Sequence, residues 1–325
     1  MEVIAIFNQK GGAGKTTTTF NLAGVLAKKY KKKVLVIDAC QQGDISKRLL
    51  TQDIAQADSR GEDFFEGRMT FEDLFLSTSW VNKAICNANL EVTSRYSARK
   101  RGIDIIPVKP ADEQRERRDG KTDISLADVE RLLLEEENED LEVRYSYVKK
   151  MLSNIKREPH HWYEYDFVLF DFPPALTEVG YCILSACNHI LVPACLDVNS
   201  VEGLSGIVNT VNILRSKSIN PDISILGFFF SNVKTVSSFD SQLIGMMKES
   251  LGDYMFDLAI RMHDDAKDSM LNGLPLAWFR RNGKVTKDFE LLTQEILYRL
   301  GQLPEEELGE LEEAKQVFRE KYYNN

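Results

Sequence analysis

Residues 3–17 read Val-Ile-Ala-Ile-Phe-Asn-Gln-Lys-Gly-Gly-Ala-Gly-Lys-Thr-Thr, which is the most informative part of the sequence for the fold. It begins with a continuous apolar run, which is typical of a strand buried on both faces of a parallel sheet. After it, apolar residues recur at helical spacing as far as residue 30. The glycines in between let successive backbone N–H groups converge on an anion, and the helix N-terminus adds partial positive charge. The stretch therefore predicts a phosphate-binding loop between a strand and a helix.

The loop contains the residue types of a nucleotide site. We expect Lys15 to reach the β and γ phosphates and the Thr16 hydroxyl to bind Mg²⁺. The expected nucleotide contacts come from Gly11, Gly12, Ala13, Gly14, Lys15, Thr16 and Thr17. The general pattern G-x-x-x-x-G-K-[ST] asks for a further glycine where Asn8-Gln9 stand, so the match is not literal.

Five further apolar runs predict strands, at residues 34–38, 103–108, 167–172, 189–194 and 223–231. Helical patterns lie between several of them, for example at residues 201–217. Strands that alternate with helices predict an α/β fold, with a doubly wound, mostly parallel sheet and helices on both faces.

The rest of the chain predicts one domain over residues 1–301, with a charged insertion or loop near 112–140. An acidic C-terminal helix or tail follows over residues 302–325. Its apolar residues fit one helical stripe made of Leu308, Leu311, Val317, Phe318 and Tyr322. Such a helix would either dock on the domain or bind a partner.

Composition excludes several classes of protein. The 325 residues include 41 basic and 50 acidic ones, for a formal charge of −9, so DNA binding requires a local basic patch. No apolar run approaches the roughly 20 residues that span a bilayer. The five cysteines form no C-x-x-C pair, which argues against a zinc site or a disulfide framework. We expect a cytoplasmic protein.

Lys10, five residues before Lys15, makes the loop similar to the deviant Walker A motif K-G-G-x-G-K-[ST] of the ParA/MinD family of P-loop ATPases. Residues 8–9 and 16–23 resemble the ParA branch in particular. Residues 165–174, Tyr-Asp-Phe-Val-Leu-Phe-Asp-Phe-Pro-Pro, resemble that family's Walker B strand, and 34–38 its second strand. The resemblance covers roughly residues 2–50, 103–108 and 165–300.

The resemblance implies ATP and Mg²⁺ as cofactors and a homodimer in the ATP state. Lys10 would cross the dimer interface to the partner's nucleotide, as an arginine finger acts in trans. Asp38 and Asp171 would lie near Mg²⁺ together with Thr16. Asn232, at the end of the strand at 223–231, stands where the family commonly reads adenine.

One position departs from the ParA pattern Asp-x-Asp-Pro-Gln-Gly-Asn, because residues 38–44 read Asp-Ala-Cys-Gln-Gln-Gly-Asp. Cys40 replaces the aspartate that orients the attacking water, and a neutral thiol cannot do this as a carboxylate does. Three interpretations remain: hydrolysis is slow, or Asp44 takes the place of the missing aspartate, or Gln41 or Gln42 orients the water. The candidate catalytic residues are Lys10, Lys15, Asp38 and Asp44.

ParA-type ATPases bind DNA nonspecifically, which predicts a cationic surface here. The first candidate is Arg280, Arg281, Lys284 and Lys287; the others are residues 28–33, 99–101 and 115–118. The leading hypothesis is a ParA-like ATPase that acts in plasmid partition or chromosome segregation, with a ParB-like or other adaptor, and is nucleoid-associated in the ATP state. One alternative is a nucleotide-binding positioning scaffold with little hydrolysis. Another is a MinD-like membrane-positioning ATPase, although the acidic tail predicts no stable membrane association.

Overall fold

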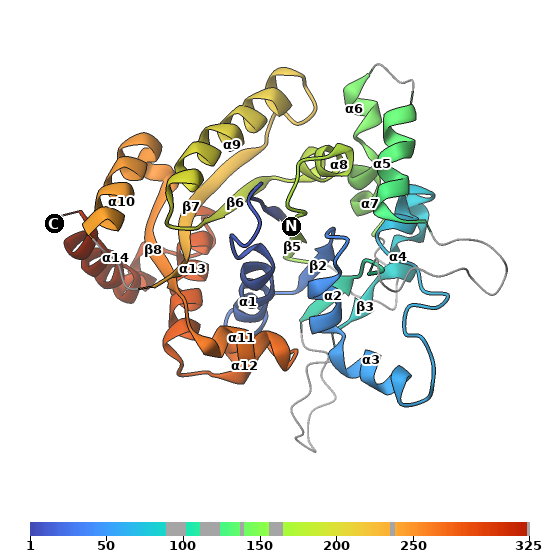
Figure 1. The fold of residues 1–325 in the computed structure, drawn as a ribbon, viewed down its shortest axis with the longest axis horizontal. Helices are drawn as coiled ribbons and strands as arrows, with labels where there is room; N and C mark the ends of the chain where they lie inside the picture. Colours follow the sequence, from blue (N-terminus) through green and yellow to red (C-terminus); the bar gives the residue numbers. More distant parts are fainter. Residues whose placement is uncertain (89–101, 111–123, 137–139, 156–164, 235–237, 324–325) are drawn as a thin grey trace.

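The computed structural model describes residues 1–88, 102–110, 124–136, 140–155, 165–234 and 238–323. An eight-stranded sheet runs through them in the order β3-β4-β2-β5-β1-β6-β7-β8 (Figure 1). All neighbouring strands are parallel except β3 and β4. The strands are β1 (Glu2–Ile6), β2 (Val34–Asp38), β3 (Cys86–Asn87), β4 (Ile103–Ile106), β5 (Phe167–Asp171), β6 (His189–Ala194), β7 (Ser224–Val233) and β8 (Met255–Arg261).

All six strands predicted from the sequence are present, and the doubly wound α/β fold is confirmed. Two strands were not predicted. β3 is a two-residue strand at one edge, too short to leave a pattern. β8 forms the other edge, and its apolar run is interrupted by Asp257.

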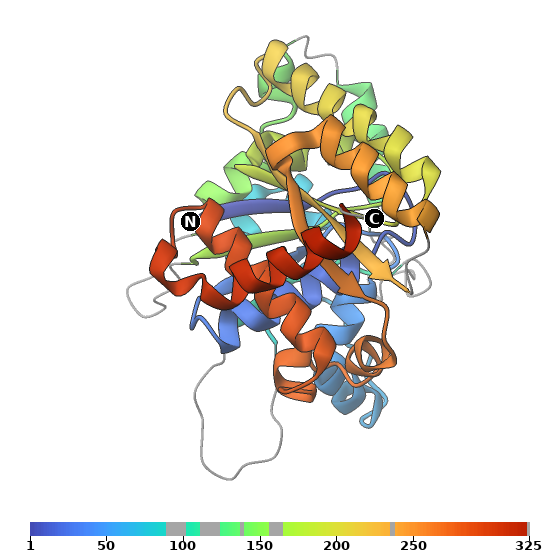
Figure 2. The same ribbon diagram turned by 90° about the vertical axis from the view of Figure 1, so that its left-hand side faces the viewer.

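The central strands are buried on both faces because their alternate residues enter two separate cores. Val3 and Ala5 of β1 belong to one core, and Ile4 and Ile6 belong to the other. The first core is covered by α4 (Val81–Ala84), α5 (Leu126–Glu135), α6 (Leu141–Arg144), α7 (Tyr147–Ser153), α8 (Glu178–Ala186), α9 (Val198–Ser216) and α10 (Ser238–Leu251). The second is covered by α1 (Lys15–Lys28), α2 (Asp44–Leu49), α3 (Thr51–Asp58), α11 (Asp264–Leu271), α12 (Leu276–Phe279) and α13 (Lys284–Arg299). Figure 2 shows the sheet between these two layers.

The last helix, α14 (Gly309–Tyr322), lies along the edge strand β8. Its Leu311 enters the second core, whereas Phe318 and Tyr322 enter the first, so the helix joins the two cores across the sheet edge. Covering an edge strand in this way protects its backbone from pairing with other chains. Val317 does not share the buried stripe: it is 62% exposed, so that part of the prediction was wrong.

Ion pairs to two buried carboxylates hold α14 in place. Lys315 binds Glu295 of α13 at 2.5 Å, and Arg319 binds Asp257 of β8 at 2.7 Å. Both carboxylates are buried, and each has a second cation, Arg299 for Glu295 and Lys248 for Asp257. Of the two alternatives for the C-terminal helix, these contacts favour docking on the domain over binding a partner.

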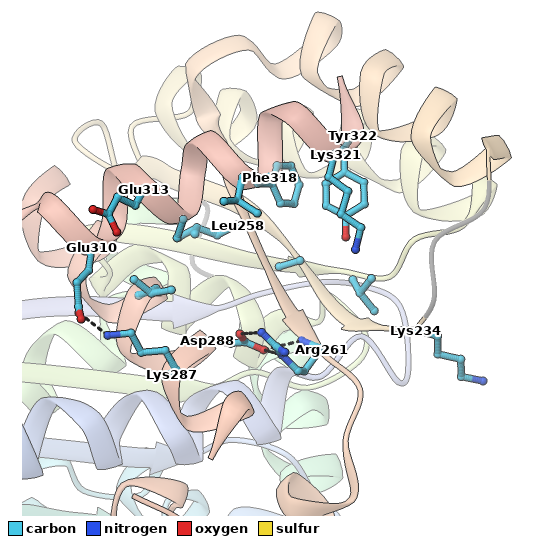
Figure 3. A pocket seen from close by; sticks show the side chains of 15 residues that line it. Lys234, Leu258, Arg261, Lys287, Asp288, Glu310, Glu313, Phe318, Lys321 and Tyr322 are labelled. Carbon is cyan, nitrogen blue, oxygen red and sulfur yellow. Dashed lines mark hydrogen bonds and ion pairs between the residues drawn. The ribbon is translucent and has the colours of Figure 1, made fainter. Parts of the chain in front are cut away.

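A groove of about 550 Å³ remains between β8, α13 and α14 (Figure 3). Arg261 crosses its floor and binds Asp288 through both carboxylate oxygens at 2.7 Å. Lys287 and Glu310 pair at its other end. The groove thus combines two ion pairs with an apolar lining that includes Leu258, Leu291 and Phe318.

Part of the predicted charged segment at 112–140 lies outside the described residues. The described part includes α5, which begins with a capping box formed by Ser125 and Asp128. Glu130 of α5 accepts hydrogen bonds from the N–H groups of Glu178 and Val179, at the start of α8. This segment thus contributes a helix to the layer that covers the first core. Within the described ranges, no helix is long and apolar enough to cross a bilayer.

Candidate nucleotide site

The loop between β1 and α1 has the backbone of an anion cradle. Gly12 and Gly14 have φ values of 74° and 82°, in the left-handed region that glycine adopts without strain. A Cβ at Gly11 or Gly12 would meet no atom within 4 Å, so the loop is open on this side. Gly14 is confined, because a Cβ there would lie 3.3 Å from Ser231 Oγ. The loop therefore leaves its glycine backbone accessible to a phosphate chain.

Lys15 begins α1, and its side chain points back into the loop. Its Nζ donates to the carbonyl oxygens of Asn8 at 2.9 Å and Lys10 at 3.1 Å. Burial lowers the pKa of this ammonium, while the charge of Asp171 and the nearby Cys40 oppose that shift. The lysine thus lies close both to the loop and to the carboxylates at the sheet edge.

Asp38 and Asp171 end the neighbouring strands β2 and β5 and are paired in register. Both carboxyl groups are buried. Burial raises the pKa of Asp38 to about 6, even though it accepts hydrogen bonds from Ser46 and Cys40. Burial and the charge of Asp38 raise the pKa of Asp171 to about 8. Two desolvated carboxyl groups this close make a site that favours a cation.

The two carboxyl groups differ in their hydrogen bonds. Asp38 Oδ1 accepts from Cys40 N at 3.0 Å, and Oδ2 accepts from Ser46 N at 3.0 Å and Ser46 Oγ at 2.6 Å. Asp171 Oδ1 accepts from Thr19 Oγ1 at 3.4 Å, whereas its Oδ2 has no hydrogen-bond partner among the described residues. Against the rise that burial causes, Thr16 is close enough to this carboxyl group to lower its pKa. A buried oxygen without a partner calls for an explanation, and a cation beside Thr16 and Asp171 would supply one.

Cys40 is the second residue after β2 and is half-buried. Burial raises the pKa of its thiol to about 11, with a further rise from the charges of Asp38, Asp171 and Asp44. The group is therefore a neutral thiol at physiological pH.

The other candidates for holding water surround Cys40. Asp44 is the exposed first residue of α2, and its charge contributes to the raised pKa values of Asp38 and Asp171. Gln41 and Gln42 line a pocket of about 390 Å³ together with Cys40 and residues of α5 and the loop after β5. The structure brings all four side chains to one end of the sheet.

Asn232 lies beside the loop, at the end of β7. It has a φ of 56°, and its Nδ2 donates to Gly12 O at 3.4 Å. The preceding Ser231 donates from Oγ to Ala13 O at 2.7 Å. Sequence reasoning missed Ser231, whose only signal was its position next to Asn232.

Lys10 stands at the rim of the loop, and its ammonium binds the carboxylate of Asp197 at 2.5 Å. Asp197 is the N-cap of α9. Asp197 was not predicted as a site residue, although an aspartate three residues before Ser200 is a recognisable helix-start signal.

Two of the four basic clusters are described by the structure, and they meet on one surface. Lys28 lies over the ring of Trp278, and Lys29 and Lys287 both approach Glu290, at 2.7 Å and 4.0 Å. Arg280 lies 3.7 Å from Asp265. In the part of the chain that the structure describes, Arg281 and Lys284 are exposed and form no ion pair. The clusters at 99–101 and 115–118 lie outside the described residues.

These features define a class of protein. The sheet is mostly parallel, and a glycine-rich loop follows its first parallel strand. A lysine begins the next helix, and a buried acid ends the adjacent strand. Together these features are those of a P-loop nucleotide-binding protein. In the described ranges, no group of three His, Cys, Asp or Glu side chains could hold a metal ion, so a metal here would depend on Thr16 and the carboxylates.

Comparison with known proteins gives the family. Residues 4–276 match the profile of the CobQ/CobB/MinD/ParA nucleotide binding domain, and the chain belongs to this family. The chromosome-partitioning ATPase Soj of Treponema pallidum is 28% identical over 301 residues, which cover 93% of this chain and 99% of Soj.

Solved structures agree on the fold. An ATP complex of a McdA variant from Cyanothece has a TM-score of 0.66 at 22% identity and covers 94% of this chain and 98% of McdA. Cobyrinic acid a,c-diamide synthase from Mycobacterium smegmatis, with an ATP analogue and magnesium, has a TM-score of 0.64 at 18% identity, covering 93% and 96%. At these identities the likeness concerns the fold alone.

Proposed function

We propose that this protein is a ParA-like ATPase that binds ATP and Mg²⁺, dimerises as a nucleotide sandwich and binds DNA without sequence preference. Its task would be to partition or position a DNA or protein cargo. The observation that carries the proposal is the phosphate loop with two differently placed lysines. Lys15 is buried against the loop carbonyls, whereas Lys10 lies at the accessible rim.

The nucleotide contacts follow from the geometry of the loop. The backbone of residues 11–17 would hold the phosphates, with Lys15 at the β and γ positions. Thr16 and the free oxygen of Asp171 fit Mg²⁺, which when bound neutralises charge on the phosphates. Asp38 would be a second carboxylate near the ion, with its own oxygens fixed by Cys40 and Ser46. Asn232, next to Gly12, stays a prediction for the adenine.

Hydrolysis is proposed to be slow because Cys40 is a neutral thiol. It can neither take a proton from water nor orient water as strongly as a carboxylate. A long-lived ATP dimer would follow, and a ParB-like or other adaptor protein would be needed to stimulate turnover. If turnover is negligible, the protein is a nucleotide-dependent scaffold, and the same thiol favours this second candidate.

The DNA surface is proposed at Arg280, Arg281, Lys284 and Lys287. Arg281 and Lys284 are the stronger members because Lys287 pairs with Glu290 and Glu310, and Arg280 lies near Asp265. A MinD-like membrane role would need a basic amphipathic helix that can leave the domain. The acidic α14 is held by Glu295 and Asp257, which argues against it.

The experiment that tests this function measures ATP turnover, DNA gel shift and molecular mass by light scattering, each with and without ATP–Mg²⁺. We expect a mass near twice 37.1 kDa with ATP and DNA binding that appears only in that state. Lys15→Ala should lose nucleotide binding, and Lys10→Ala should bind nucleotide but remain monomeric. DNA binding that is independent of ATP, or dimerisation of Lys10→Ala, would contradict the sandwich.

A further inference from the structure

The backbone of Lys10 is fixed to the sheet. Its N–H donates to Asn8 Oδ1 at 2.9 Å, and its carbonyl oxygen accepts from Lys15 Nζ at 3.1 Å. Asn8 in turn donates from Nδ2 to Pro193 O of β6 at 2.7 Å. The main chain of Lys10 therefore stays in place relative to β6, and only its side-chain torsions remain adjustable.

Asp197, three residues after the end of β6, is equally well fixed. Its Oδ1 accepts hydrogen bonds from Ser200 N at 3.0 Å and Ser200 Oγ at 3.2 Å, which cap the start of α9. Its Oδ2 is thereby directed at the ammonium of Lys10, 2.5 Å away. Burial alone would raise the pKa of Asp197, but the hydrogen bonds from Lys10 and Ser200 outweigh it and lower the pKa. The carboxylate is thus charged and oriented before any nucleotide arrives.

The pair is accessible from outside. The side chains of Lys10 and Asp197 are 34% and 38% exposed, so the ammonium can exchange Asp197 for another anion without crossing the core. An exposed pair of this kind is weak, which is what an exchangeable contact requires. A buried pair would instead hold the lysine too firmly.

We infer that Asp197 is the positioning residue for Lys10: it holds the ammonium within its own subunit until the nucleotide of a second copy replaces the carboxylate. The inference depends on the proposed sandwich dimer. In each subunit the dimer would exchange the Lys10–Asp197 contact for a contact between Lys10 and the partner's phosphates. Asp197 would then set the threshold of ATP and protein concentration at which dimers form.

The test compares Asp197→Asn with the wild type in the presence of a non-hydrolysable ATP analogue and Mg²⁺. Asparagine keeps the cap on α9 but removes the charge that holds Lys10. The dimer dissociation constant, from light scattering over a dilution series, should fall about threefold per subunit and so roughly tenfold per dimer. Ser200→Ala is the matched control: it removes one hydrogen bond to the same carboxylate but leaves the Lys10 contact, and should leave the constant unchanged.

A second readout follows the lysine directly. Without nucleotide, acetylation of Lys10 by acetic anhydride, followed by mass spectrometry, should be faster in Asp197→Asn than in the wild type and Ser200→Ala. In a Lys10→Ala background, which should remain monomeric, Asp197→Asn should not restore dimerisation.

The outcomes separate the two proposals. If the wild type dimerises with the analogue but Asp197→Asn dimerises no better than Ser200→Ala, the positioning role is wrong and the sandwich stands. Dimerisation that Asp197→Asn restores in the Lys10→Ala background also overturns the role. A wild type that stays monomeric with the analogue overturns the sandwich itself.

Discussion

Replacing Cys40 by aspartate should convert a slow ATPase into a faster one. The side chain lies two residues after β2, near Lys15 and the carboxyl groups of Asp38 and Asp171. A carboxylate at this place can orient the attacking water and accept its proton, which the thiol cannot. Groups of this kind contribute about 10²- to 10⁴-fold, or about 3–5 kcal/mol of barrier. This is the largest gain that Cys40→Asp should give.

The same surroundings limit the gain at low pH. Burial first, and then Asp38, Asp171 and Asp44, raise the pKa of the thiol, and they will raise the pKa of a carboxyl group placed there. Each unit by which that pKa exceeds the assay pH lowers the ionised fraction about tenfold. Because only the ionised form accepts a proton, the rate of Cys40→Asp should rise with pH until the group is fully ionised. Bound Mg²⁺ lowers the required pH.

The assay is phosphate release from ATP–Mg²⁺ between pH 6.5 and 8.5. Cys40→Asn is the matched control, because it has the size of aspartate but cannot ionise, and it should stay as slow as the wild type. Asp44→Asn and the Gln41→Ala and Gln42→Ala variants test the other candidates. The reasoning is refuted if Cys40→Asp turns over no faster than Cys40→Asn at any pH. A wild type that is already fast, and is abolished by Asp44→Asn, would show instead that Asp44 holds the water.

Three further predictions concern the loop, the buried acids and the DNA surface. The pKa of Asp171 rises from 3.8 to about 8 in the folded protein. The nucleotide-free fold therefore binds more protons than the unfolded chain between these values, and its free energy of unfolding should fall as pH rises. Urea titrations from pH 5 to 8 should show this fall in the wild type and a smaller fall in Asp171→Asn. An equal slope of unfolding free energy against pH in the two proteins would contradict the prediction. Gly14→Ala should lower the free energy of unfolding by about 1–2 kcal/mol and impair nucleotide binding, because φ is 82° at Gly14 and Ser231 is close. Gly11→Ala is the control, and its thermal unfolding should match that of the wild type. Arg280→Ala with Arg281→Ala should weaken DNA binding about equally on unrelated duplexes and flatten the salt slope by about one per lost phosphate contact. Unchanged affinity would move the site to residues 28–33 or 99–101.

The sheet could be predicted because its central strands are apolar on both faces. β8 was not predicted because Asp257 interrupts its apolar run. That carboxylate is tolerated in a buried position only because Lys248, Arg319 and Tyr323 bind it from α10, α14 and the residue after α14. Arg319 and Tyr323 lie 62 and 66 positions from Asp257, so the strand could not be predicted from its own residues.

The nucleotide site likewise contains residues that could be predicted from the sequence and residues that could not. Lys15, Thr16 and Asp171 follow from a local motif and from the end of an apolar strand, and the structure brings them together. Asp197 could be recognised as a helix cap, but its bond to Lys10 spans 187 positions in the sequence. The meeting of residues 28–33 with Arg280–Lys287 is likewise tertiary, since it depends on α1 packing against α12 and α13.

The two lysines of the loop show why binding and dimerisation can be controlled separately. Lys15 is held by carbonyl oxygens of its own loop and has a pKa lowered by burial, so its position depends on the fold alone. Lys10 has its backbone fixed by the loop but its charge fixed by a carboxylate on another element, α9. Any movement at the start of α9 therefore changes where the Lys10 charge lies without disturbing Lys15. A partner that binds near this helix could alter dimerisation while leaving nucleotide affinity intact, and the contrast between Asp197→Asn and Lys15→Ala measures that separation.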